Sequence, residues 1–150
     1  MNREITVIFT DIVGFTAHSD AMDAEGVATL LNAHFGDVSA AVEAEDGTID
    51  KFIGDSVMAF WGAPHRQPDH AQRAVRAVIA MTARIRARNA DRTTQGLSPI
   101  RVRIGVHSGD AVVGNIGAPG RVNYTIVGDT VNIGSLLEQL CKEVAPDADV

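Results

Sequence analysis

Two aspartates stand at positions where a divalent metal ion could be bound. Asp11 directly follows a β-branched apolar run at residues 4–9, and Asp55 lies in the dipeptide that joins two further apolar runs, 48–53 and 56–61. If these runs pair as strands, both carboxylates reach the same edge of a sheet. Mg²⁺ usually takes one or two carboxylates and completes its octahedron with water and substrate phosphates. Capping of turn amides by aspartate is the alternative explanation.

The residues that follow Asp11 are suited to an anion. Residues 9–16 read FTDIVGFT, so that a turn built on glycine comes immediately after a metal-type carboxylate. Backbone N–H groups exposed at such a turn can form a nest for phosphate oxygens. A triphosphate held at this turn is therefore predicted to contact Val13, Gly14, Phe15 and Thr16.

The elements that must position these groups follow from periodicity and turn signals. Apolar residues at three- and four-residue steps predict helices over 27–45 and 69–90 and a last helix over 129–143. Short apolar or alternating runs predict strands at 4–9, 48–53, 56–61, 100–107, 111–116 and 122–127, with a turn at Ser108-Gly109-Asp110. Strands mixed with long helices in this order favour an α+β sandwich with one sheet face covered by helices. The last helix carries an apolar stripe that needs a surface to lie on.

Composition and charge exclude several classes of protein. The 150 residues are 45% hydrophobic and 21% charged, which indicates one folded domain, 1–150. A net charge of −6 disfavours nucleic acid as a partner. The single cysteine excludes a disulfide scaffold and fits a cytoplasmic location. No apolar run approaches the ~20 residues of a membrane span, so that membrane contact would require a longer parent chain.

Four segments together resemble the motifs of class III nucleotidyl cyclases, in the order that this family has them. They are FTDIVGFT at 9–16, DKFIGDS at 50–56, VHSG at 106–109 and YTIVGDTVN at 124–132. The resemblance implies the fold of the cyclase catalytic domain, a ferredoxin-like antiparallel sheet with helices on one face. It also implies synthesis of a cyclic nucleotide and pyrophosphate from a nucleoside triphosphate.

The same resemblance assigns roles to individual residues. Two divalent ions, Mg²⁺ or Mn²⁺, would be held by the side chains of Asp11 and Asp55 and by the carbonyl of Ile12. In relatives, one ion activates the ribose 3′-hydroxyl and the other anchors the β- and γ-phosphates, which is a two-metal arrangement. Arg103 corresponds to a residue that contacts the terminal phosphates, and a surface arginine is the alternative. Asn132 corresponds to a catalytic asparagine on the last helix.

Lys51 and Thr125 correspond to the two family residues that choose the purine. A lysine can donate to adenine N1 and a threonine hydroxyl can accept from the exocyclic amine, which indicates ATP as substrate. Guanylyl cyclases carry glutamate with cysteine or a similar residue there. In the family these residues come from the second subunit, which implies a homodimer with two shared sites.

Two departures from the family put activity in doubt. Leu136 stands where relatives have an arginine, four residues after Asn132. We expect impaired catalysis, and three explanations stay open: a substitution that traps substrate, a naturally impaired or regulatory homologue, or replacement of the charge by another cation such as Arg121. The second departure is at the carboxyl terminus, where the chain ends before further strands of the family, so that we expect a truncated sheet. A nucleotide-binding regulatory domain is the alternative function, and a guanylyl cyclase is the third.

Overall fold

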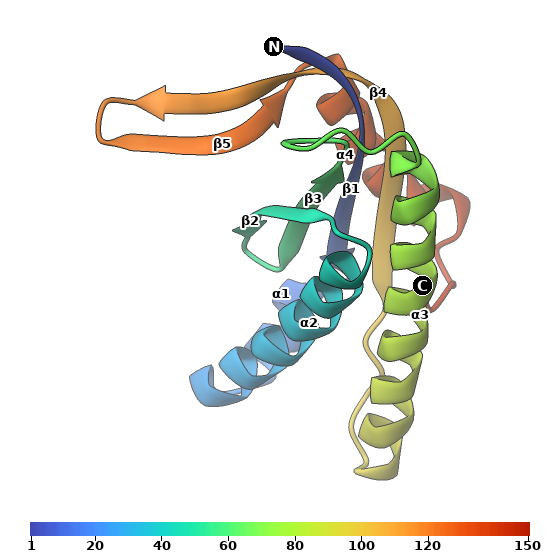
Figure 1. Ribbon diagram of the computed structural model, residues 1–150. Helices are drawn as coiled ribbons and strands as arrows, with labels where there is room; N and C mark the ends of the chain where they lie inside the picture. The colour runs from blue at the N-terminus through green and yellow to red at the C-terminus, as the bar shows by residue number, and fades with distance from the viewer.

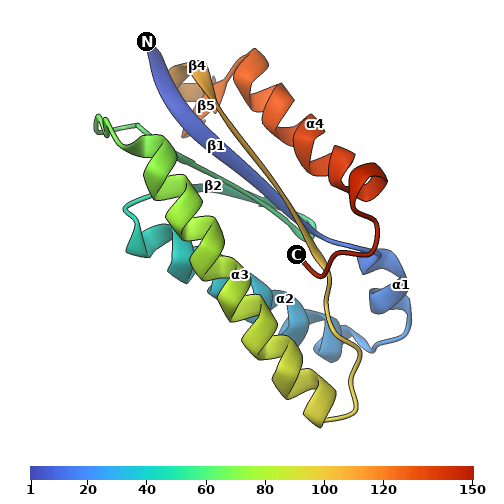
Figure 2. The same cartoon turned by 90° about the vertical axis from the view of Figure 1, so that its right-hand side faces the viewer.

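The computed structural model describes all 150 residues as one five-stranded sheet with helices on both faces (Figures 1 and 2). The elements in chain order are β1 (Asn2–Ile12), α1 (Phe15–Asp20), α2 (Ala24–Ala44), β2 (Thr48–Ile53), β3 (Ser56–Trp61), α3 (His70–Thr94), β4 (Val102–Ala118), β5 (Arg121–Val127) and α4 (Asp129–Val144). The strand order across the sheet is β2-β3-β1-β4-β5, and every neighbouring pair is antiparallel. The expected α+β class with an antiparallel sheet is confirmed.

The central strand β1 is buried on both sides. Ile5, Val7 and Ile8 are fully shielded from solvent although successive side chains of a strand point to opposite faces. Both faces of β1 must therefore be covered. This explains why the apolar residues of the run at 4–9 point to both faces and do not alternate strictly with polar ones.

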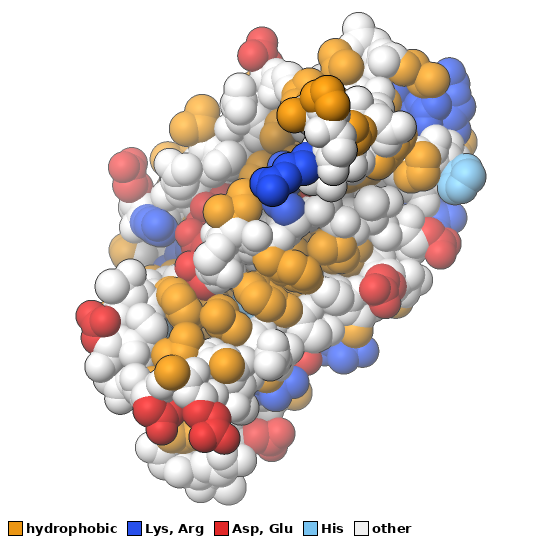
Figure 3. Space-filling view, turned by 90° about the vertical axis from the view of Figure 1, so that its left-hand side faces the viewer, with side chains coloured by type: hydrophobic (Ala, Val, Ile, Leu, Met, Phe, Trp, Pro, Cys, Tyr) orange, Lys and Arg blue, Asp and Glu red, His pale blue; other side chains and the backbone are white.

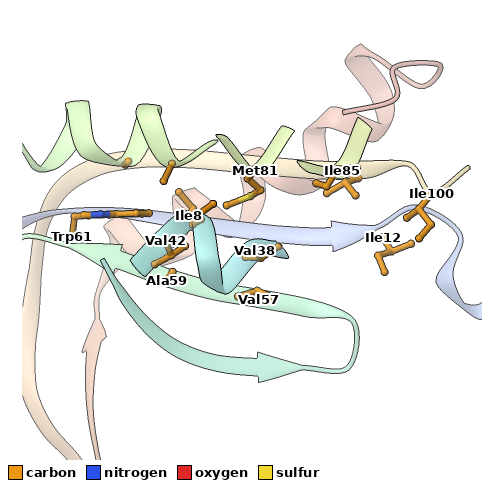
Figure 4. Close-up of a cluster of buried hydrophobic side chains, with 14 of the residues drawn as sticks. Ile8, Ile12, Val38, Val42, Val57, Ala59, Trp61, Met81, Ile85 and Ile100 are labelled. Carbon is orange, nitrogen blue, oxygen red and sulfur yellow. The ribbon is translucent and has the colours of Figure 1, made fainter. Parts of the chain in front are cut away.

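Helices α2 and α3 cover one face of the sheet, as expected for a face covered by helices. Figure 4 shows the core that they form, in which Ile8 of β1 and Trp61 of β3 lie against Val42 of α2 and Met81 and Ile85 of α3. Helix α2 begins at Ala24, three residues before the predicted start, because the Asp23 side chain accepts a hydrogen bond from the Gly26 amide at 2.7 Å and caps the first turn.

The prediction that helices cover only one face is wrong, because helix α4 packs on the opposite face of the sheet (Figure 2). It approaches the sheet closely because small residues meet there: a Cβ on Gly105 of β4 would lie 2.4 Å from the Glu138 amide nitrogen, and one on Gly134 would lie 2.8 Å from Val7. The residues of α4 that turn toward the sheet are Thr130, Gly134 and Glu138. Its apolar stripe faces outward, with 40–72% exposure at Ile133, Leu136, Leu140 and Val144.

The turn predicted at Ser108-Gly109-Asp110 is wrong, because these residues lie inside the single long strand β4. They pair without interruption with β1, Ser108 opposite Thr6 and Gly109 opposite Ile5. Gly109 is required by packing: a Cβ there would meet the Thr130 hydroxyl of α4 at 2.6 Å. The helix predicted over 69–90 extends further than expected, since α3 continues to Thr94, just before Gly96.

The far halves of β4 and β5 form an arm that extends away from the body of the sheet and lies over the β2–β3 side (Figure 1). None of the helices combines the length and the apolar character that crossing a bilayer requires.

Replacing Gly105 by alanine is expected to destabilise the protein. The added methyl group would overlap the backbone of α4, and such overpacking costs about 1–3 kcal/mol. Gly36→Ala is the matched control: Gly36 lies in the interior of α2 with open space around its Cα, and alanine there should stabilise by up to about 1 kcal/mol. Urea unfolding of both variants measures the difference, and equal effects would contradict close packing of α4 on β4.

Candidate active site

The structure brings the two predicted metal ligands to one edge of the sheet. Asp11 lies near the end of β1, and Asp55 lies in the tight turn between β2 and β3, where Gly54 has a φ of 60°. The amide of Ile12 donates a hydrogen bond of 2.7 Å to Oδ2 of Asp55. Pairing of β1 with β3 thus places the second carboxylate directly beside the residue that follows the first.

Asp11 faces α4, and its carboxylate is only partly neutralised. Oδ2 lies 3.7 Å from Nζ of Lys142, whereas the buried Oδ1 has no hydrogen-bond partner. Glu138 is 6% exposed, and its Oε1 is also buried without a partner. These residues line a cleft of about 540 Å³ together with Thr10 and Ser56.

Glu138 is the most strongly perturbed acid of the site. Burial raises the pKa of Glu138 to about 8, and the neighbouring carboxylate of Asp11 adds to the increase. Glu138 is therefore mostly protonated at neutral pH, which reduces its repulsion with Asp11.

The donor set fits divalent cations. Asp11 and Asp55 supply hard oxygen ligands, and Asp11 has a buried oxygen that lacks a partner, which is the arrangement that a bound Mg²⁺ or Mn²⁺ would satisfy. No group of three or more His, Cys, Asp or Glu side chains forms a closed metal cage. The site thus resembles those in which substrate phosphates complete the coordination.

A second cluster joins strands from opposite edges of the sheet. The hydroxyl of Thr125 on β5 donates a hydrogen bond to Oδ2 of Asp50 on β2, and Nζ of Lys51 lies 3.8 Å from Oδ1 of the same carboxylate. The Asp50 side chain is 1% exposed, and that of Lys51 is 48% exposed. Lys51 and Thr125, which were predicted to act as a pair, therefore share one buried partner.

The residues predicted to contact phosphates lie beside the metal ligands. Gly14 has a φ of 65° and caps the short helix α1, which begins at Phe15, and Thr16 is exposed. The amide of Val13 already donates to the carbonyl of Arg101 at 2.8 Å. Of the four turn amides, that of Val13 is thus held within the protein.

Arg103 pairs with Asp11 in the β1–β4 register, so the two side chains share a sheet face. Arg103 is 2% exposed, and its guanidinium donates to the carbonyls of Pro146 and Ala148, at 2.9 and 2.8 Å. The segment after α4 therefore occupies both terminal nitrogens of Arg103, whereas its buried Nε has no partner.

Asn132 and Leu136 lie together on the outer face of α4, one turn apart. Both are exposed, Leu136 by 61%, and no hydrogen bond joins Asn132 to Asp11 or Asp55 of the same chain. The helix thus presents Glu138 to its own sheet and Asn132 with Leu136 to the outside.

Sequence reasoning missed three residues of these clusters: Asp50, Glu138 and Lys142. The signal for Glu138 was available, because it lies four residues after Gly134 and three before Cys141, on the helical face that meets the sheet. Asp50 lies at an irregularity in the β2–β3 pairing, between Ile49 and Lys51, and the sequence does not reveal which way such a residue points.

Comparison with known proteins defines the family. The sequence matches the adenylate and guanylate cyclase catalytic domain over residues 1–145, and the chain belongs to this family. Adenylate cyclase 1 of Rhizobium meliloti (strain 1021) is 44% identical over 141 residues, which are 94% of this chain and 21% of that protein. Adenylate cyclase of Anabaena cylindrica is 34% identical over 94% of this chain and 28% of that protein. The chain thus spans roughly a quarter of the length of these relatives.

Solved structures agree with the fold and differ in substrate. The adenylyl cyclase CyaB from P. aeruginosa superposes with a TM-score of 0.88 at 39% identity, over 93% of this chain and 72% of that chain. The guanylyl cyclase Cya2 gives a TM-score of 0.86 at 38% identity, over 93% of this chain and 71% of that chain. Overall similarity therefore does not distinguish adenine from guanine, and the choice must be argued from individual side chains.

The raised pKa of Glu138 predicts how stability depends on pH. Glu138 has a pKa of about 8 in the folded protein against 4.5 for the free side chain, so the folded state retains a proton that the unfolded state releases. The free energy of unfolding of the metal-free protein should therefore fall as the pH rises from 4.5 to about 8. The glutamine side chain of Glu138→Gln is uncharged at every pH, so this variant should show a smaller decrease in stability with rising pH. Urea unfolding in EDTA between about pH 5 and 9 measures it.

Glu143→Gln is the control for this experiment, because Glu143 lies on the same helix and is exposed. The control should keep the pH dependence of the parent. Identical pH profiles for the parent and Glu138→Gln would show that Glu138 ionises normally in the folded protein.

Proposed function

We propose that this chain is the catalytic domain of an adenylyl cyclase, which converts ATP to 3′,5′-cyclic AMP and pyrophosphate. The observation that carries the proposal is the cluster of Lys51 and Thr125 around Asp50. Two residues 74 positions apart, on strands at opposite edges of the sheet, lie at one buried carboxylate. Their chemistry matches the edge of adenine.

Adenine and guanine present opposite patterns to such a pair. Adenine N1 accepts and its exocyclic amine donates, whereas guanine N1–H donates and its O6 accepts. A lysine ammonium can only donate, and a threonine hydroxyl can accept. Lys51 would face a second donor if guanine were bound, which supports ATP over GTP as substrate.

Asp11, Asp55 and the carbonyl of Ile12 would hold two divalent ions, Mg²⁺ or Mn²⁺, beside the triphosphate. When bound, the ions supply Lewis-acid stabilisation of the attacking 3′-oxygen and of the leaving pyrophosphate oxygens. The protein fixes the two carboxylates: the Ile12 amide orients Asp55, and the sheet register orients Asp11. The turn at residues 13–16 would contact phosphate oxygens. Arg103 would contact the terminal phosphates once the carbonyls of Pro146 and Ala148 leave its guanidinium.

The direction of side chains supports a homodimer with shared sites. Asn132 and Leu136 are exposed on the outer face of α4, away from Asp11 and Asp55 of the same chain, where a second copy could bring its own carboxylates. Figure 3 shows hydrophobic side chains spread over the side toward which the arm and the β2–β3 hairpin extend. The large exposed apolar residues of these elements are Phe52, Ile53, Ile116, Val122 and Tyr124. Exposed apolar surface of this kind is typical of an interface.

Leu136 favours a second candidate, a regulatory domain that binds nucleotide with little turnover. Leucine cannot donate to the developing charge on the α-phosphate, and loss of one preorganised donor typically slows chemistry by 10²-fold or more. Arg121, the other cation considered, lies at the start of β5 on the exposed arm. Product formation by the unmodified chain separates the two candidates.

Leu136→Arg is expected to raise kcat for cyclic AMP formation at least about a hundredfold, which is ~2.7 kcal/mol of barrier. The affinity for ATP should barely change, because a contact made only in the transition state acts on kcat. Since Leu136 is already exposed, folding should tolerate the change. Steady-state kinetics with chromatographic identification of cyclic AMP and cyclic GMP makes the measurement.

Leu140→Arg is the control, because Leu140 is an exposed leucine one turn further along α4. It adds the same charge to α4, but at a position that does not correspond to the arginine of the family. A kcat for Leu136→Arg within about threefold of the parent would show that another residue supplies the charge.

Asp11→Ala and Lys51→Ala, each inactive alone, should regain activity when mixed. A mixed dimer holds one site with both residues intact and one site that lacks both. The experiment uses the Leu136→Arg background so that activity can be measured. Cyclic AMP formation is followed across mixing ratios, with heterodimers verified by differential tags.

Asp11→Ala mixed with Asp55→Ala is the matched control and should stay inactive, because both substitutions remove ligands contributed by the same half of each site. Recovery in the control, or no recovery in the test pair despite verified heterodimers, would refute sharing of sites between subunits.

A further inference from the structure

Asp50 is a buried carboxylate that lies between the two residues proposed to choose the base. Its side chain is 1% exposed, although β2 is an edge strand of the sheet. It lies where the β2–β3 register shifts between Ile49 and Lys51, an irregularity that turns a side chain out of the normal alternation. Its polar contacts are the Thr125 hydroxyl at Oδ2 and the Lys51 ammonium, 3.8 Å from Oδ1.

These contacts fix the direction of the Thr125 hydroxyl. A carboxylate can only accept hydrogen bonds, and a hydroxyl has one proton to donate. Because Asp50 takes that proton, only the lone pairs of the Thr125 oxygen remain for another partner. Thr125 is itself 6% exposed, so water has little access to reorient the hydroxyl.

We propose that Asp50 is a positioning residue that makes Thr125 an acceptor, and thereby sets a preference for a purine with a 6-amino group over a 6-oxo purine. Asp50 acts through Thr125 and does not itself contact the base. The inference rests on the proposed function, because it concerns how that same site reads adenine. A hydroxyl free to rotate could donate to guanine O6 as readily as it accepts from an amine.

The substitution Asp50→Asn hardly changes the volume of the side chain, but it is expected to reverse the direction in which the Thr125 hydroxyl points. Lys51 can only donate, so the amide oxygen of the new side chain should turn toward Lys51 and its NH₂ group toward Thr125. The Thr125 oxygen then accepts from the amide, and its proton points outward. Asp50→Asn is therefore expected to weaken binding of the adenine nucleotide and strengthen binding of the guanine nucleotide.

The test measures affinities of the full chain for N-methylanthraniloyl ATP and N-methylanthraniloyl GTP by fluorescence titration with Mn²⁺. The ratio of the two affinities should fall at least about tenfold in Asp50→Asn, because one hydrogen bond is lost with adenine and one is gained with guanine. In a Thr125→Val background, Asp50→Asn should change the ratio by less than about twofold. Asp50→Ser, whose hydroxyl can donate or accept, should also lower the ratio and serves if Asp50→Asn fails to fold.

Asp110→Asn is the matched control, since it makes the same charge change at an exposed carboxylate and should keep the parent ratio. Equal losses for both nucleotides in Asp50→Asn, or a change that persists in Thr125→Val, would overturn the inference. A parent protein that binds neither nucleotide would instead refute the proposed function. A parent that prefers ATP, with a ratio unaffected by Asp50→Asn, would leave that function intact and remove Asp50 from base choice.

Discussion

The register in which β1 pairs with β3 and β4 is the constraint on which the rest of the site depends. It places Asp11 opposite Arg103 and brings the Ile12 amide within 2.7 Å of Asp55. Successive side chains of a strand point to opposite faces, so a slip of one residue would turn Asp11 toward α2 and α3. Burial of Ile5, Val7 and Ile8 on two covered faces makes such a slip costly, because each buried side chain would lose the neighbours that it packs against. The packing of the core and the direction of the Asp11 side chain are thus both set by the register of β1.

The site is more acidic than its own side chains can neutralise. Asp11 and Glu138 each have a buried oxygen without a partner, and Lys142 reaches only one oxygen of Asp11. Buried carboxylates in this situation either keep a proton, as the raised pKa of Glu138 indicates, or bind cations. Folding energy contributed by the core therefore maintains buried carboxylates whose charge the protein only partly neutralises. Arg103 forms no hydrogen bond with either carboxylate, since its terminal nitrogens donate to backbone carbonyls.

The sequence predicted those parts of the structure that local signals determine. Periodicity and turn residues gave the strands around Asp11 and Asp55 and the helices α2 and α3, because burial of one face leaves a repeat in the chain. The turn at Ser108-Gly109-Asp110 was wrong because those glycine signals reflect contact with α4 and not chain reversal. Contacts between distant segments could not be predicted from periodicity: Asp50 meets Thr125 only because the β4–β5 arm lies over β2. The family resemblance paired Lys51 with Thr125, but it offered no reason to consider the carboxylate between them.

The two faces of helix α4 contribute differently to folding. The inner face needs small residues to approach the sheet, so substitutions there change the free energy of unfolding. The outer face carries Asn132 and Leu136, which contribute nothing to the core of their own chain. Folding therefore places little constraint on position 136. A leucine there is compatible with an intact fold because its side chain lies outside the core of its own chain and packing does not depend on it.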